Sequence, residues 1–158
     1  MDKIAVLGAG SWGTALSIGL ATKGYPVSLW ARDEELRKNI NDQRENARYL
    51  KGCPIPAQVT ANVHLEDCVQ QARVVVLAVP SHAIREVARQ CSSYIGAETY
   101  IVNTAKGFEL ETLKYLSTAI QEEMPAHAAD NVAVLSGPSH AEEVGKGMPT
   151  TVVVAAKK

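Results

Sequence analysis

The sequence has no excess charge of either sign and no long hydrophobic run. It carries 16 Lys and Arg residues against 17 Asp and Glu, which gives a net charge of -1 at pH 7. A nucleic-acid-binding surface usually needs a clustered basic excess, so we expect no nucleic-acid partner. No apolar stretch approaches the roughly 18 to 20 residues that cross a bilayer, and Met1-Asp2-Lys3 does not begin a signal peptide. These absences predict a cytoplasmic protein without membrane insertion.

Cysteine is also scarce. Cys53, Cys68 and Cys91 are odd in number and form no C-x-x-C pair, and the four histidines lack the spacing of metal ligands. The sequence therefore predicts neither a disulfide framework nor a metal site. Reduced thiols agree with the cytoplasmic location.

The chain does have enough apolar residues for one core, since 46% of its 158 residues are hydrophobic. Runs of strand and helix character alternate, which predicts an α/β fold with a doubly wound, mostly parallel sheet, the NAD(P)-binding Rossmann fold. The polar stretch 43–62 is expected to be a long loop, 63–72 a short helix, and the very apolar strand 73–79 the centre of the sheet. The other strands are expected near 3–7, 27–31, 99–104, 131–135 and 150–156, and the other helices near 11–23, 33–42, 83–91, 110–123 and 139–145.

A glycine-rich turn follows the first predicted strand. The run Gly8-Ala9-Gly10-Ser11-Trp12-Gly13 separates this strand from the first predicted helix. In such a turn Gly8 allows the sharp bend, Gly10 lets the backbone approach a diphosphate, and Gly13 lets the helix pack close to the strand. The N–H groups of the first helical turn then face the anion. The turn predicts a dinucleotide-binding site.

The end of the second predicted strand bears on which coenzyme is bound. A strict NAD-binding domain places an acid there to hold the ribose 2′-hydroxyl, whereas this chain has Arg32 followed by Asp33. A guanidinium can pair with the 2′-phosphate of NADP, so Arg32 favours NADP, while Asp33 leaves NAD open. Alternatively, Arg32 is a surface residue that pairs with Asp33 or Glu35.

Three later strand ends carry further candidates. Ser81 is expected to cap the helix that follows strand 73–79, and Lys106, after strand 99–104, to offer a positive charge to a phosphate or a carbonyl oxygen. Ser139 and Glu142 have the spacing of a capping box, which is also compatible with a phosphate or sugar hydroxyl at the helix start. The histidines beside two of these residues, His82 and His140, are given no catalytic role.

Taken together, several of these motifs resemble the bacterial NAD(P)-dependent glycerol-3-phosphate dehydrogenases. The resemblance runs in order along almost the whole chain, although Lys51 stands where the family pattern usually has proline. The residues that carry it are Gly8-Ala9-Gly10-Ser11-Trp12-Gly13-Thr14-Ala15-Leu16, Trp30-Ala31-Arg32, Asn46-Ala47-Arg48-Tyr49-Leu50, Val79-Pro80-Ser81, Ala105-Lys106-Gly107 and Leu135-Ser136-Gly137-Pro138-Ser139.

The resemblance implies reversible hydride transfer between NADP or NAD and dihydroxyacetone phosphate, which forms sn-glycerol 3-phosphate for phospholipid synthesis. It implies substrate contacts from Lys106, Gly137 and Ser139. It also implies coenzyme contacts, which together with the glycine turn comprise Gly8, Gly10, Ser11, Trp12, Gly13, Arg32, Tyr49, Lys106 and Ala141.

The resemblance also implies a second part of the protein. The family's catalytic lysine lies in a C-terminal helical domain that no segment here matches, so residues 1–158 are expected to be the dinucleotide-binding domain, without a catalytic residue. This chain alone is expected to bind nucleotide without turnover, and a homodimer of the full-length form stays open. The alternatives are a related two-domain hydroxy-acid or hydroxyacyl dehydrogenase, or a non-catalytic nucleotide-responsive binding module.

Overall fold

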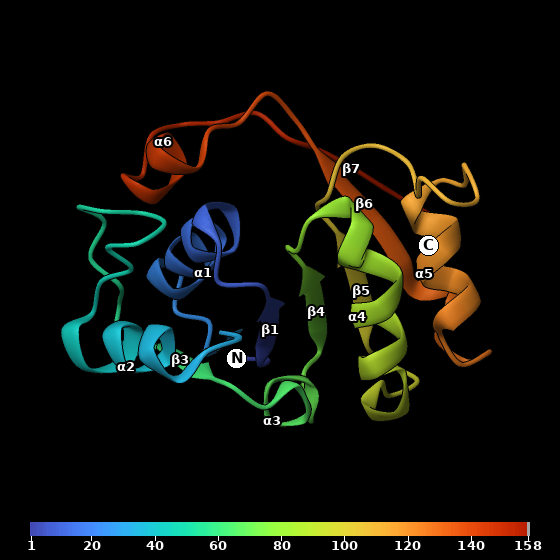
Figure 1. Ribbon diagram of the computed structural model, residues 1–158, viewed down its shortest axis with the longest axis horizontal. Coiled ribbons are helices and arrows are strands. Elements are labelled where there is room, and N and C mark those ends of the chain that lie inside the picture. The colour runs from blue at the N-terminus through green and yellow to red at the C-terminus, as the bar shows by residue number, and fades with distance from the viewer. Residues whose placement is uncertain (158) are drawn as a thin grey trace.

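A seven-stranded sheet organises the chain. The computed structural model describes residues 1–157 and has the strand order β3-β2-β1-β4-β5-β6-β7 (Figure 1). All neighbouring strands are parallel except β7, which runs antiparallel to β6. The predicted doubly wound α/β fold is therefore confirmed. The strand order reverses between β1 and β4, and ligands bind such folds at this switch point, beyond the carboxyl ends of the strands.

The strands are short and the helices alternate with them. The strands are β1 (Ile4–Leu7), β2 (Val27–Trp30), β3 (Val59–Asn62), β4 (Val74–Leu77), β5 (Tyr100–Asn103), β6 (Val132–Ser136) and β7 (Val153–Ala156). The α-helices are α1 (Ser11–Thr22), α2 (Glu34–Gln43), α3 (Leu65–Val69), α4 (Ile84–Cys91), α5 (Leu116–Glu123) and α6 (Ala141–Gly145), with 3₁₀ turns at Ser81–Ala83, Ser92–Tyr94 and Ala129–Asn131. Within residues 1–157 no helix is long and apolar enough to cross a membrane.

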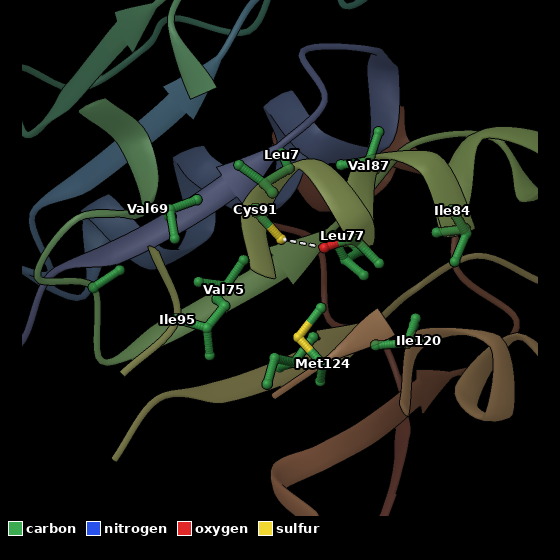
Figure 2. Packing of buried hydrophobic residues seen from close by; sticks show 14 of the residues in the cluster. Leu7, Val69, Val75, Leu77, Ile84, Val87, Cys91, Ile95, Ile120 and Met124 are labelled. Atoms are coloured by element: carbon green, nitrogen blue, oxygen red, sulfur yellow. Dashed lines mark hydrogen bonds between the residues drawn. The ribbon is translucent and has the colours of Figure 1, made fainter. Parts of the chain in front are cut away.

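Two hydrophobic clusters lie on opposite faces of the sheet. Successive residues of β1 alternate between them, so this strand is buried on both sides, as its continuous apolar run predicts. One cluster packs the sheet against α3, α4 and α5, and Figure 2 shows its side chains, among them Leu7, Leu77 and Ile120. There the Cys91 thiol donates to the Ala88 carbonyl at 3.3 Å, and burial raises its pKa to about 12. The other cluster packs the sheet against α1 and α2.

The centre of the sheet is as predicted, whereas its edge strand β3 was not predicted. The apolar strand β4 is the central one, and the short helix expected in 63–72 is α3. The expected loop 43–62, however, ends in the edge strand β3. Only Val59 and Ala61 of this strand are buried, so its apolar signal is too weak to stand out from the preceding Gly- and Pro-containing stretch.

The helix expected over 110–123 begins only at Leu116. Residues 108–115 instead fold back on themselves, with a bridge between Phe108 and Tyr115 and a hydrogen bond from the Glu109 N–H to the Lys114 carbonyl at 3.0 Å. The Glu109 side chain is held by Arg85 of α4, and this tertiary contact accounts for the shorter helix.

Both predicted serine caps are wrong. The helix after β4 opens with a 3₁₀ turn whose cap position is Pro80, and Ser81 makes no capping hydrogen bond. Helix α6 begins at Ala141, so its cap position is His140. Ser139 therefore lies one residue before the cap position and Glu142 lies at N2, whereas a capping box needs these two residues at N-cap and N3.

Candidate functional site

The three glycines of the turn after β1 have different surroundings. Gly8 has a φ of +124°, and a Cβ there would lie 2.6 Å from the Ala78 carbonyl oxygen. A Cβ at Gly13 would lie 1.8 Å from the Gly8 carbonyl oxygen. At Gly10 a Cβ would meet no protein atom within 4 Å. Two glycines thus permit close packing of strand and helix, whereas Gly10 faces open space, as expected for the position that a diphosphate approaches.

Helix α1 presents free donors to this space. Its cap position is Gly10, which has no side chain to accept hydrogen bonds from the first helical turn, and no side-chain cap is formed. The N–H groups at a helix start carry partial positive charge and need an acceptor. An anion placed at the turn would supply that acceptor, so these residues fit the diphosphate of a dinucleotide.

A cavity of about 410 Å³ opens beside the glycine turn at the carboxyl ends of β1, β2 and β4. Its walls bring together the turn, the end of β2, the loop after α2 and the start of α4. Of the predicted site residues it contains Gly8, Gly10, Arg32 and Tyr49. Its lining is largely apolar, with Arg32 beside the acidic residues Asp33 and Glu86. Its position at the strand ends suits the adenosine half of a dinucleotide.

Arg32 and Asp33 have different roles at the end of β2. The Asp33 side chain caps α2, since one carboxylate oxygen accepts a hydrogen bond from the Leu36 N–H at 2.7 Å. The other oxygen lies 3.8 Å from an Arg48 guanidinium nitrogen. Arg32 is exposed, and no ion pair joins it to Asp33 or Glu35 within the described chain. Arg32 is one of the residues that line the cavity.

A second cavity of about 390 Å³ lies on the other side of α1, at the carboxyl ends of β5 and β6. Across it the Lys106 ammonium donates to the Gly137 carbonyl at 3.0 Å. This cavity is lined by all three residues predicted to contact substrate and by four predicted to contact coenzyme, Lys106 belonging to both sets. These lining residues are Ser11, Trp12, Lys106, Gly137, Ser139 and Ala141.

The loop between α2 and β3 closes over the glycine turn. The Ser11 hydroxyl donates to the Tyr49 carbonyl at 2.6 Å, which holds this loop against the start of α1. In the same loop, the buried Asn46 side chain donates hydrogen bonds to the Ala9 carbonyl and to the Thr14 hydroxyl. No role was predicted for Asn46, although it opens the segment Asn46-Ala47-Arg48-Tyr49-Leu50, one of those that carry the family resemblance.

Arg85 braces the segment that follows Lys106. Its guanidinium forms two hydrogen bonds with Glu109, at 2.5 and 2.8 Å, and further ones with Glu122 and Glu123 of α5. Arg85 was also missed, because an arginine on an exposed-looking helix face gives no sign of partners 24 to 38 residues away. The brace fixes residues 108–115 against α4 and α5.

Because this brace, formed by Arg85 with Glu109, Glu122 and Glu123, depends on ionised carboxylates, we expect its contribution to stability to be lost in acid. Hydrogen bonding from Arg85, and next from Thr112, lowers the pKa of Glu109 from 4.5 to about 2. A carboxyl group with a lowered folded-state pKa stabilises the fold fully above its unfolded pKa and loses this effect as the pH falls toward the folded value. We expect the free energy of unfolding to fall less steeply between pH 5 and pH 2 in Glu109→Gln than in the wild type, as measured by urea unfolding. Glu35→Gln, which changes an exposed carboxylate outside the brace, is the control, and equal slopes in all three proteins would contradict the assignment.

The reversed strand order, the glycine turn open at Gly10 and the arginine at the end of β2 define a dinucleotide-binding domain of the Rossmann class. Residues 3–158 match the family model described as NAD-dependent glycerol-3-phosphate dehydrogenase N-terminus. The chain belongs to this family.

Individual relatives agree with this assignment. The glycerol-3-phosphate dehydrogenase (NAD(P)+) of Moorella thermoacetica is 54% identical over 155 residues, which cover 98% of this chain and 45% of the relative. The enzyme of the same name from Bacillus licheniformis is 46% identical, with coverage of 99% and 45%. A crystal structure of glycerol-3-phosphate dehydrogenase from Coxiella burnetii has a TM-score of 0.89 at 34% identity and covers 99% of this chain and 47% of that one. The chain thus spans less than half the length of these relatives.

Proposed function

We propose that residues 1–158 form the coenzyme-binding domain of an NAD(P)-dependent glycerol-3-phosphate dehydrogenase. The whole enzyme would interconvert dihydroxyacetone phosphate and sn-glycerol 3-phosphate for phospholipid synthesis. The observation that carries the proposal is the open space beside Gly10 at the uncapped start of α1, where Gly10 lines one cavity and the adjacent Ser11 lines the other. The names of relatives up to 54% identical support this substrate over a hydroxy acid or an acyl thioester.

The two cavities would bind different parts of the coenzyme. The glycine turn would hold the diphosphate, Arg32 and Tyr49 the adenosine half, and Ser11, Trp12 and Ala141 the nicotinamide half of the coenzyme. When bound, the coenzyme supplies or accepts the hydride.

Substrate recognition would be shared by Lys106, Gly137 and Ser139. The Lys106 ammonium, already directed across its cavity to Gly137, would offer positive charge to the substrate's phosphate or to its carbonyl oxygen. The catalytic lysine belongs to the C-terminal helical domain of the proposed enzyme. The proposal also includes a cytoplasmic location and a homodimeric full-length form, with no nucleic-acid partner.

The role of Arg32 gives a direct test of coenzyme binding. We expect Arg32→Ala to weaken NADPH binding by about 10-fold, or about 1.4 kcal/mol, because a charge-assisted contact with the 2′-phosphate is lost. NADH binding should change less than about 2-fold, because NADH lacks that phosphate. Titration calorimetry with both coenzymes measures the two affinities.

Lys38→Ala provides the matched control, since it removes an exposed positive charge on α2 outside the cavity. Equal weakening of both coenzymes in Arg32→Ala, or equal effects of the two substitutions, would argue against phosphate recognition by Arg32. A wild-type chain that bound neither coenzyme would overturn the proposed function.

A further inference from the structure

Asn46 connects two loops from the interior of the protein. Its side chain is fully buried, although it belongs to the surface loop between α2 and β3. The amide group donates to the Ala9 carbonyl at 3.0 Å and to the Thr14 hydroxyl at 2.8 Å, and its oxygen accepts from the Tyr49 N–H at 3.2 Å. Both amide hydrogens are therefore used on the glycine turn and the start of α1.

The contact with Ala9 determines the orientation of one peptide group. The Ala9–Gly10 bond is trans, and in a planar trans peptide the carbonyl and the following N–H point in opposite directions. Asn46 holds the Ala9 carbonyl toward the interior, so the Gly10 N–H points the other way. Gly8, Ala9 and Gly10 line the larger cavity, and no residue in 1–157 accepts a hydrogen bond from this N–H. The donor is left for a ligand.

The Ala9–Gly10 peptide group needs a contact from outside the turn to fix its orientation, because the residues around it are flexible. It is flanked by Gly8 and Gly10, whose backbones rotate more freely than those of other residues. The Ala9 residue is itself buried, so its carbonyl must find a donor. Without the Asn46 amide, the nearest source of donors is water in the cavity, and a carbonyl turned that way would repel an anion there.

We propose that Asn46 is a positioning residue for the coenzyme diphosphate: by holding the Ala9 carbonyl inward it aims the Gly10 N–H at the anion. This inference rests on the proposed function. The Tyr49 N–H lies 3.2 Å from the Asn46 side-chain oxygen and 3.2 Å from the Asn46 backbone carbonyl oxygen, so the adenosine-binding loop keeps a backbone contact when the side chain is removed.

The test compares a ligand that contains the diphosphate with one that lacks it. NADPH has both the diphosphate and the 2′-phosphoadenosine group, whereas 2′-AMP has only the latter. We expect Asn46→Ala to weaken NADPH binding at least about 10-fold and 2′-AMP binding less than about 2-fold in titration calorimetry of the chain. A role confined to general support of the fold would weaken both ligands equally.

Thr14→Val is the matched control, because it removes the other acceptor of the same amide and leaves the Ala9 contact in place. It should lower the melting temperature while NADPH affinity stays within about 2-fold. If Asn46→Ala does not fold, Asn46→Ser provides the same comparison with a side chain too short to hold Ala9.

Unchanged NADPH binding in the Asn46 variant, equal loss of both ligands, or an equal loss of NADPH binding in Thr14→Val would overturn the inference. In each of these cases the wild-type chain still binds NADPH, so the proposed function would stand. Failure of the wild type to bind NADPH would overturn the proposed function first.

Discussion

Gly10→Val is expected to fold normally and to bind NADPH at least about 100-fold more weakly than the wild type, which corresponds to about 2.7 kcal/mol. A Cβ at this position would meet no protein atom within 4 Å, and the φ and ψ of -76° and -173° are accessible to valine. The valine methyl groups would instead occupy the space from which the helical N–H groups reach the diphosphate. Loss of two charge-assisted hydrogen bonds accounts for an effect of this size. Titration calorimetry and thermal unfolding measure the two properties separately.

Gly10→Ala serves as the graded control for this prediction. Its smaller side chain should weaken NADPH binding by an amount between those of the wild type and the valine variant. The free energy of unfolding should stay within about 1 kcal/mol in both variants, because only the cap position of α1 changes. Unchanged NADPH affinity in Gly10→Val would show that the diphosphate does not lie at this turn.

The parts of the fold that the sequence predicts well are those in which local pattern and tertiary environment agree. β1 and β4 are apolar at every position because helices cover both faces of the sheet, and such runs are recognisable without any structure. β3 was missed because every second residue of it is exposed or only partly buried, so it lacks a continuous apolar run. The start of α5 was misplaced because Arg85 holds Glu109 in a turn, which no local signal encodes.

In the candidate site, too, features that follow from local sequence and topology could be predicted, whereas those that depend on tertiary contacts could not. Lys106, Gly137 and Ser139, which the family resemblance grouped as substrate contacts, line one cavity because each follows the carboxyl end of β5 or β6, where ligands bind in such sheets. The role of Asn46 could not be predicted in this way. Its amide acts on Ala9, 37 residues earlier in the chain, and that contact exists only after the loop has closed over the turn.

Gly13→Ala should destabilise the fold by more than about 3 kcal/mol, even though alanine favours helices more than glycine does. The added Cβ would lie 1.8 Å from the Gly8 carbonyl oxygen and 3.2 Å from the Ala78 Cβ. Neither contact can be relieved by moving a flexible side chain, so α1 would have to shift away from β1 and β4. The midpoint of urea unfolding, followed by circular dichroism, measures this loss.

The same helix offers a control with the identical chemical change. Gly19 also lies in α1, but a Cβ there meets no atom within 4 Å, so Gly19→Ala should stabilise the protein by about 0.5 to 1 kcal/mol through helix propensity. Opposite signs for the two substitutions would place the close approach of helix and strand at Gly13. Stabilisation by Gly13→Ala would contradict that packing. NADPH binding distinguishes the roles of the two glycines. Gly13→Ala should lose NADPH affinity together with stability, whereas Gly10→Val should lose affinity alone.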